Sequence, residues 1–132
     1  AESKPCLACH ACRKVMQDIH PDVTFVRDAE HKELSIDTVR AMRADAFIRP
    51  NEGKRKIYII PRGQDMNESA QNALLKILEE PPDYGVFLIL STNAERLLPT
   101  IRSRCGSAEA YLEAEYGLTP ARLMRLRRMY LE

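Results

Sequence analysis

The sequence predicts an α/β fold, three-layer α-β-α, in which a mostly parallel sheet lies between helices. Residues 57–60 (IYII) and 86–90 (VFLIL) are short, almost uninterrupted apolar runs, and residues 67–82 (NESAQNALLKILEEPP) separate them. Runs without alternation are typical of parallel strands that are buried on both faces, and parallel neighbours are joined by a helical crossover. The three segments therefore predict a βαβ unit.

The middle segment carries the clearest helix signal in the chain. Its apolar residues recur at helical spacing and form one stripe: Ala70, Ala73, Leu74, Ile77 and Leu78. Asn67 is a suitable N-cap because its side-chain oxygen can accept a free first-turn N–H. Pro81 disfavours helical geometry at the residue before it, so the helix should end near Glu80.

Length and charge limit the possible functions. The 132 residues suit one domain or part of one, and 20 Lys and Arg against 19 Asp and Glu leave a net charge of +1. The net charge therefore creates no strong electrostatic field that would attract nucleic acid or a membrane. Binding to either would have to come from a local group of charges. No apolar run approaches the ~20 residues of a membrane span, and no signal peptide opens the chain, so we expect a soluble cytoplasmic protein without a membrane partner.

Three cysteines lie close together near the first residue, in the motif CLACHAC. The spacing of Cys6, Cys9 and Cys12 suits a tight turn that directs several thiolates at one tetrahedral Zn²⁺. A closed structural zinc site needs a fourth ligand, so plain free thiols and redox chemistry remain alternatives. The candidates for that ligand are His10, His20, Cys105 and a cysteine upstream of Ala1.

The segment after the cysteines predicts a helix and then a strand. Residues 13–19 can continue as a short helix that ends at His20-Pro21, and residues 22–26 (DVTFV) form a β-branched run. Ser35 can cap a following helix, whose inward residues would be Ile36, Val39, Met42 and Ala46.

Arg40 and Arg43 share the outer face of the helix that Ser35 caps. A solvated surface is the ordinary interpretation, and a basic strip over a phosphate backbone is the alternative.

The apolar run 57–60 ends without the residues that a nucleotide hydrolase needs. An ATPase of this architecture carries carboxylates at that end of the strand to hold Mg²⁺. Here, after a turn at residues 50–53, the strand runs into Pro61-Arg62-Gly63-Gln64. The G-x-x-x-x-G-K-[ST] loop that cradles phosphates is also missing from the sequence. Gly53-Lys54 could be its G-K pair, but the first glycine of the motif would then stand at position 48, which is Ile. We therefore predict that this chain binds and hydrolyses no ATP itself.

Polar and basic residues follow the second apolar run. Ser91-Thr92-Asn93 comes directly after it, where α/β sheets place ligand contacts. Residues 100–105 (TIRSRC) then bring Arg102 and Arg104 close together. These arginines are either ordinary surface charges or guanidinium groups that reach the nucleotide of a neighbouring subunit.

The order of IYII, MNESAQNALLKILEEPP, LILSTN and LLPTIRSRC closely resembles the ATPase-like core of bacterial DNA polymerase III clamp-loader subunits. The resemblance covers about Cys6 to Cys105, and its motifs NALLKxLEEPP and TIRSRC are highly specific. It implies a partial P-loop NTPase domain of the AAA+ class, with the phosphate-binding loop upstream of Ala1. It also implies a four-cysteine zinc module, whose first cysteine would lie upstream.

Within this family the choice is between the ATP-hydrolysing gamma/tau type and the delta-prime type. The strand of gamma/tau ends in an Asp-Glu pair, whereas the matching positions here are Pro61 and Arg62. This departure resembles delta-prime and implies a non-hydrolysing subunit. By the same resemblance Arg104 would be an arginine finger acting in trans, flanked by Ser103 and Cys105 as motif members. Thr92 and Asn93 would hold a vestigial nucleotide-sensing position.

The resemblance implies a function in replication. Five such subunits form an arc with ATP at their interfaces, and the arc opens a sliding clamp and loads it on primed DNA. The partners would be the gamma/tau and delta subunits directly, and the clamp and primer-template DNA through the assembly. A DNA polymerase holoenzyme would contain this chain as a subunit that is no enzyme by itself. The alternatives are an ATP-hydrolysing gamma/tau-type subunit and a zinc-dependent nucleic-acid-binding module.

Three regions are expected from these patterns. Residues 1–20 would form the partial zinc module, residues 21–105 the AAA+-like core, and residues 106–132 a helical tail. In the tail, Thr119 and Pro120 can begin a helix with an apolar stripe and arginines on its other side. The resemblance stops at Cys105, so the tail's relation to the family is open.

Overall fold

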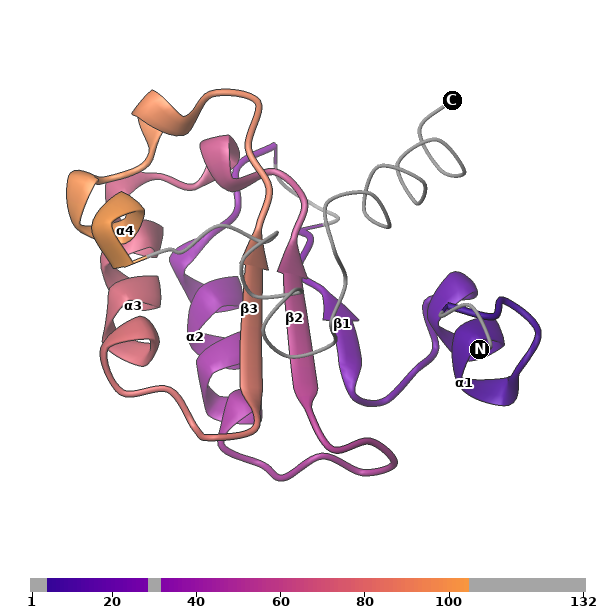
Figure 1. Cartoon of the computed structure of the whole chain (residues 1–132). Coiled ribbons are helices and arrows are strands. Elements are labelled where there is room, and N and C mark those ends of the chain that lie inside the picture. Colours follow the sequence, from indigo (N-terminus) through magenta and orange to yellow (C-terminus); the bar gives the residue numbers. More distant parts are fainter. Residues whose placement is uncertain (1–4, 29–31, 105–132) are drawn as a thin grey trace.

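A computed structural model describes residues 5–28 and 32–104 of the chain (Figure 1). The predicted tail, residues 106–132, and Cys105 lie outside the described residues. The strands are β1 (Val23–Phe25), β2 (Lys56–Ile60) and β3 (Gly85–Ile89), and the helices are α1 (His10–Met16), α2 (Ile36–Ala46), α3 (Glu68–Glu79) and α4 (Pro99–Arg104). Two single 3-10 turns, Gly63–Asp65 and Ala94–Arg96, follow β2 and β3.

The three strands form one parallel sheet in the order β1-β2-β3. Ile57 pairs with Val23 on one side and with Val86 on the other. Helix α3 connects β2 to β3, so the predicted βαβ unit and the α/β class are confirmed. The rings of Tyr58 and Phe87 stack across the two strands, with centroids 5.4 Å apart.

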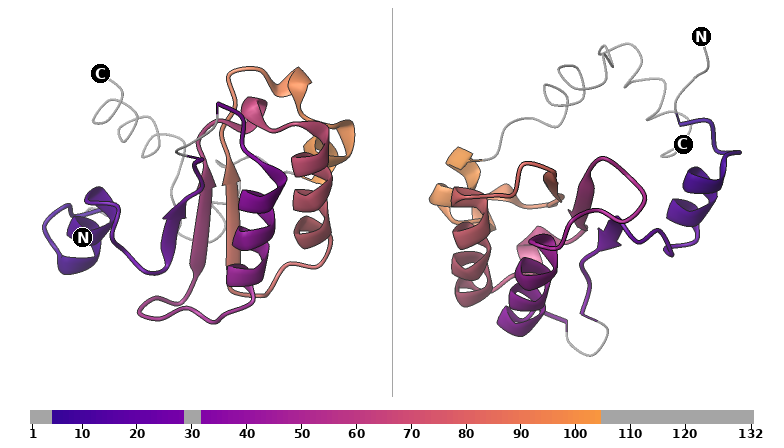
Figure 2. Two further views of the ribbon diagram at one scale, coloured as in Figure 1. Left: turned by 180° about the vertical axis from the view of Figure 1, so that it is seen from behind. Right: turned by 90° about the horizontal axis from the view of Figure 1, so that it is seen from below.

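Helices α2 and α3 cover one face of this sheet, as the two views of Figure 2 show. Tyr58 and Ile60 are buried on that side, whereas Ile57 and Ile59 of the same strand are half-buried. Among the described residues no helix packs on the opposite face. One predicted helical layer is therefore present here, and the second stays a prediction.

Helix α3 has the limits that its sequence predicts. The Asn67 side chain accepts the N–H of Ala70 at 2.8 Å, which satisfies one of the free donors of the first turn. Glu80, with φ −134° and ψ 70°, ends the helix directly before Pro81. The predicted stripe faces the core, where Ala70 and Leu74 are fully buried and Leu78 is half-buried.

Helix α2 also follows the prediction. Ser35 Oγ accepts the N–H of Thr38 at 3.2 Å, and the inward residues Val39, Met42 and Ala46 are buried. Arg40 is exposed and lies 3.7 Å from Asp37 of the same helix. Its exposure agrees with a solvated outer face.

Helix α1 begins three residues earlier than predicted. Cys9 is its N-cap, because the Cys9 thiol accepts the N–H of Cys12 at 3.4 Å. Sequence patterns reserve the cap for Ser, Thr, Asp or Asn, so a thiol cap gives no signal. The helix thus starts inside the cysteine motif and ends at Met16.

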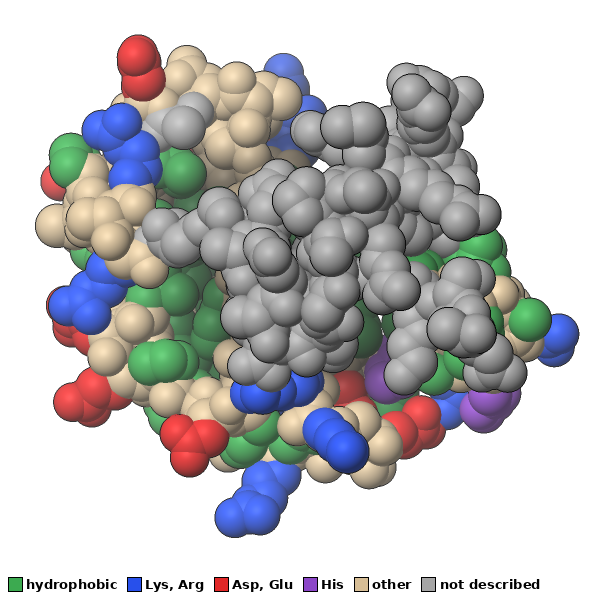
Figure 3. Space-filling view, in the orientation of Figure 1, with side chains coloured by type: hydrophobic (Ala, Val, Ile, Leu, Met, Phe, Trp, Pro, Cys, Tyr) green, Lys and Arg blue, Asp and Glu red, His purple; other side chains and the backbone are tan. Residues whose placement is uncertain are grey.

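The surface carries both signs of charge. In Figure 3 basic and acidic side chains are interspersed along the left and lower margins of the visible face. This distribution agrees with the net charge of +1. Within the part of the chain that the structure describes, no helix has the length and apolar character that crossing a membrane requires.

Candidate functional site

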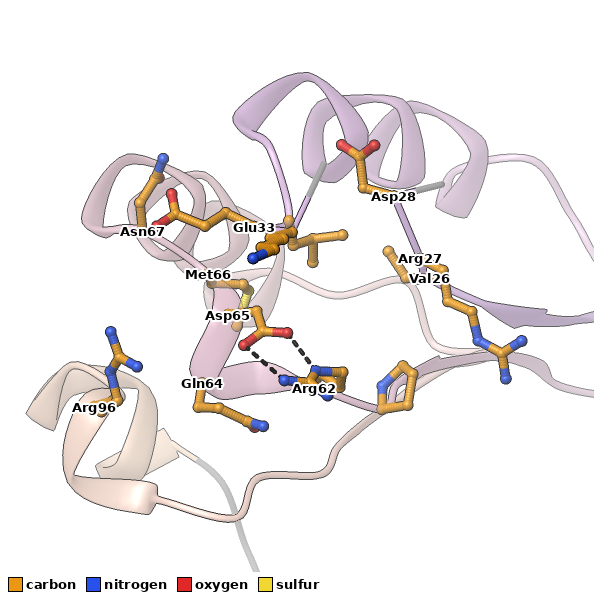
Figure 4. A pocket seen from close by; sticks show the side chains of 13 residues that line it. Val26, Arg27, Asp28, Glu33, Arg62, Gln64, Asp65, Met66, Asn67 and Arg96 are labelled. Carbon is orange, nitrogen blue, oxygen red and sulfur yellow. Dashed lines mark hydrogen bonds and ion pairs between the residues drawn. The ribbon is translucent and has the colours of Figure 1, made fainter. Parts of the chain in front are cut away.

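A pocket of about 900 Å³ opens at the carboxyl ends of β1 and β2 (Figure 4). Open α/β sheets bind ligands at this edge. The pocket is lined by the end of β1, the segment before α2, the loop after β2 and Arg96. Its lining contains both basic and acidic side chains. The groups at the end of β2 decide whether it could support hydrolysis, because an ATPase would bind Mg²⁺ there.

The loop after β2 contains one acid, and Arg62 pairs with it. Arg62 Nη2 lies 3.3 Å from Asp65 Oδ1, and its Nε bonds the other carboxylate oxygen (Figure 4). The hydrogen bond from Arg62 lowers the pKa of Asp65. A magnesium site needs carboxylate oxygens that are free to coordinate the ion. Here the carboxylate is neutralised from within its own loop, an arrangement that the sequence analysis did not foresee.

Gly63 brings this loop against the end of β3. A Cβ atom at Gly63 would lie 2.7 Å from Ile89 Cγ2 and 3.2 Å from the carbonyl oxygen of Leu90. The Gly63 N–H donates to that carbonyl at 2.8 Å. Only glycine allows so close an approach without a shift of the neighbours.

The polar residues after β3 lie next to the same loop. The backbone N–H of Thr92 donates to Gln64 Oε1 at 3.4 Å. Asn93 Oδ1 accepts the N–H of Glu95 at 3.1 Å, so this side chain stabilises its own turn. The structure thus brings Thr92 and Asn93 to the expected edge of the sheet, with both side chains exposed to solvent.

The two arginines of the TIRSRC motif lie on α4, beside α3. Ile101 is completely buried and anchors this short helix, whereas Arg102, Ser103 and Arg104 are exposed. Ser103 Oγ donates to the Thr100 carbonyl oxygen at 2.9 Å. Among the described residues Arg104 has no ion-pair partner, and its side chain is exposed.

Gln71, a residue that the sequence analysis passed over, fixes the segment leading into α4. It is 3% exposed, and its Nε2 donates to the carbonyl oxygens of Met66 at 3.1 Å and Arg96 at 3.0 Å. Its Oε1 accepts the N–H of Leu98 at 2.6 Å. The available signal was its position three residues before Leu74, which places a polar side chain on the apolar stripe of α3.

The three cysteines form a compact cluster. Their Sγ atoms all lie within 4.8 Å of one another, and those of Cys6 and Cys12 are 4.0 Å apart. Thiolates that bind one tetrahedral zinc ion are separated by about 3.8 Å, so the three residues fit such a site. Backbone N–H groups, including that of Cys9 at 3.3 Å, lower the pKa of Cys6 to about 7 and favour its thiolate form.

Neither candidate histidine joins this cluster. His10 lies on α1 and is exposed, but among the described residues the cluster consists of the cysteines alone. His20 Nδ1 accepts the N–H of Asp22 at 3.1 Å, so this ring is engaged at the start of β1. Cys105 lies outside the described residues. The fourth ligand thus remains a prediction.

Comparison with known proteins identifies the family. Residues 1–110 match the family described as DNA polymerase III, delta subunit. This chain belongs to that family. The match covers both the cysteine cluster and the TIRSRC segment.

Two bacterial relatives are named DNA polymerase III subunit delta'. The one from Buchnera aphidicola subsp. Schizaphis graminum is 36% identical over 100 residues, which are 76% of this chain and 30% of that protein. The one from Pseudomonas aeruginosa is 39% identical over 107 residues, 80% of this chain and 32% of that protein. The chain therefore spans about a third of the length of these family members.

A solved structure shows the same fold. It is a DNA polymerase III gamma subunit-related protein from Thermotoga maritima, which is 28% identical and gives a TM-score of 0.59. The superposition covers 76% of this chain and 37% of that protein. Both delta' and gamma-related proteins are thus relatives of this chain, and the groups at the strand ends must distinguish the two types.

Proposed function

We propose that this chain is part of a delta-prime-type, non-hydrolysing subunit of the DNA polymerase III clamp loader. The observation that carries the proposal is the loop after β2, where Pro61 and Arg62 stand at the end of the strand and Arg62 neutralises Asp65. Hydrolysis of ATP needs carboxylate-bound Mg²⁺ and a positioned water molecule at this edge. The two delta' relatives support the same assignment.

The proposed role is to supply charge to a neighbour's nucleotide. Arg104 would act in trans as an arginine finger, with Ser103 beside it as a motif member. Its support is geometric: Arg104 is exposed at the end of a helix whose position is fixed by buried Ile101. A guanidinium is permanently charged and planar, so it matches the charge that develops on a phosphoryl group in transfer.

The proposal also assigns partners and a location. The complete subunit would assemble with gamma/tau and delta in the cytoplasm, and would act on the sliding clamp and primer-template DNA through that assembly. It would be no enzyme by itself. Cys6, Cys9 and Cys12 would hold a structural zinc ion with a fourth ligand, and residues 1–20 would form the module around it. Zinc would supply folding energy to the module and take no part in ATP hydrolysis.

The test is substitution of Arg104 in the complete subunit, assembled with its partner subunits. Arg104→Ala should assemble normally but lower ATP turnover and clamp loading on the order of 10³-fold, because the trans charge is lost at the transition state. Arg102→Ala is the matched control, since Arg102 is also exposed on the same helix, and it should keep most of the activity. Full clamp loading by Arg104→Ala would refute the role of Arg104.

A separate assay addresses hydrolysis by the subunit. The complete subunit alone, without its partners, should show no ATP turnover above the background of the buffer. Turnover by this preparation would favour the gamma/tau-type alternative, for which the gamma-related structural neighbour is the supporting observation.

A further inference from the structure

Among the described residues, helix α1 has little apolar packing, with Val15 half-buried. It has seven residues, and none of them is buried. Isolated helices shorter than ~12–15 residues are marginal in water, and most helices in proteins are stabilised by an apolar face that packs on a core. Met16 is 66% exposed and the nearby Ile19 is 61% exposed, so most of the apolar surface at the end of α1 is in contact with solvent.

Among the described residues, an ion pair joins α1 to the loop before β2. Lys14 Nζ forms an ion pair with Glu52 Oε1, although 38 residues separate the two in the sequence. The Lys14 side chain is 20% exposed and that of Glu52 is 42% exposed, so water screens this pair only in part. Lys14 lies half a turn beyond Cys12, so the contact is made at the end of α1 away from the Cys9 cap.

The loop that carries Glu52 is itself rigidly held. Asp22 is 2% exposed, and its carboxylate accepts the backbone N–H groups of Asn51, Glu52 and Gly53 at 2.5, 2.7 and 2.6 Å. Three charge-assisted hydrogen bonds to one buried carboxylate fix the backbone at Glu52. Asp22 directly precedes β1, so Glu52 is tied to the edge of the sheet.

The segment between α1 and β1 meets the same residue. His20 Nε2 lies 3.9 Å from Glu52 Oε2, while His20 Nδ1 accepts the N–H of Asp22. The Glu52 carboxylate thus lies between Lys14 of α1 and His20 of the connecting segment. A single acidic side chain therefore contacts both the helix and its connection to the sheet.

We propose that Glu52 is an electrostatic latch that holds the cysteine-bearing arm, residues 5–20, against the edge of the parallel sheet. Glu52 makes the ion pair with Lys14, and the Asp22 carboxylate holds the backbone of the loop that carries Glu52. Because the docking is made by charge rather than by apolar area, high salt or a charge reversal opens it while the sheet and α2 and α3 stay folded. This inference does not depend on the role of Arg104 or on the identity of the metal.

The test compares charge reversals in the complete, metal-loaded subunit by hydrogen–deuterium exchange. Glu52→Lys should speed amide exchange in residues 10–20 by about threefold to tenfold, because an attraction is replaced by a repulsion. The double variant Lys14→Glu with Glu52→Lys restores the opposite charges and should return the rate to within about twofold of the original. Raising the salt from about 0.05 M to 0.5 M should speed the same amides in the unaltered protein.

Glu79→Lys is the matched control, since Glu79 is an exposed glutamate on α3, and it should leave exchange in the arm unchanged. Amides of α3 serve as the internal measure that each variant is folded. Unchanged exchange in the arm of Glu52→Lys, or a double variant as fast as the single one, would overturn the latch. Metal content and ATP turnover are measured separately. The exchange result can therefore be interpreted even if zinc binding or the role of Arg104 is disproved.

Discussion

The sheet with α2 and α3 and the cysteine-bearing arm are stabilised by different forces. In the first region, Val39, Ala70 and Leu74 are completely buried between helices and strands. Among the described residues of the arm, α1 has no fully buried side chain, and the contacts are the thiol cluster, backbone caps and the pairs that Lys14 and His20 make with Glu52. Burial of apolar area stabilises the sheet region by many small contributions that add to a large total. The arm is stabilised by fewer and weaker polar contacts, so each contact matters more.

Because the two regions are stabilised differently, a substitution should have different effects in each: global unfolding in the sheet region and local release in the arm. A cavity in the sheet region should lower the free energy of unfolding of the whole domain, because that region folds cooperatively. Loss of a ligand or an ion pair in the arm should instead release the arm locally. Asp22 stands where the two regions meet, since it precedes β1 and holds the loop of Glu52.

The largest expected effect is in the sheet region. Leu74→Ala should lower the free energy of unfolding by about 2–5 kcal/mol, because Leu74 is fully buried and its truncation leaves a cavity. Denaturant unfolding of the complete subunit measures this change. Lys76→Ala, exposed on the same helix, should cost far less. Equal effects of the two substitutions would contradict the packing described for α3.

An intermediate effect is expected at the junction. Asp22→Asn removes one charged acceptor from a loop that uses three N–H donors, so it should cost roughly 1–3 kcal/mol at neutral pH. Burial would raise the pKa of Asp22, but the N–H groups of Asn51, Gly53 and Glu52 hold it below its usual value. The contribution of the carboxylate is therefore present above the unfolded pKa and is lost as pH falls through the lower folded pKa.

The stability difference between the original protein and Asp22→Asn should accordingly narrow as pH falls below about 4. Unfolding curves at a series of pH values measure this difference. Asp83→Asn, at an exposed aspartate, serves as the control. A difference that stays constant through this range would show that the charge of Asp22 contributes nothing.

The smallest effect on global stability is expected in the arm. Cys9→Ala removes the thiol cap of α1 and one of three clustered ligands, so bound zinc should be lost to a chelator and amides of α1 should exchange faster. The unfolding free energy of the sheet region should change by less than about 0.5 kcal/mol. Elemental analysis and hydrogen exchange measure the two parts. Retention of zinc by this variant would argue against a cysteine site at Cys9.

Local signals explain why some elements could be predicted and others could not. Asn67 and Pro81 act on the backbone within a few residues of themselves, so the limits of α3 follow from its own sequence. The start of α1 was missed because its cap is a thiol. The pair of Arg62 with Asp65 and the bonds of Gln71 were missed because apolar periodicity carries no information about which polar groups satisfy one another.

The α/β class, the parallel βαβ unit and the clustering of the cysteines could be predicted from the amino-acid sequence, because they depend on periodicity and spacing along a short stretch of chain. Two contacts became known only from the folded chain: the Glu52 loop, bound by Asp22, meets α1, and Gln71 fixes the approach to α4. Those contacts join residues 25 to 38 positions apart. Their geometry arises when strands and helices pack, and no local pattern encodes it.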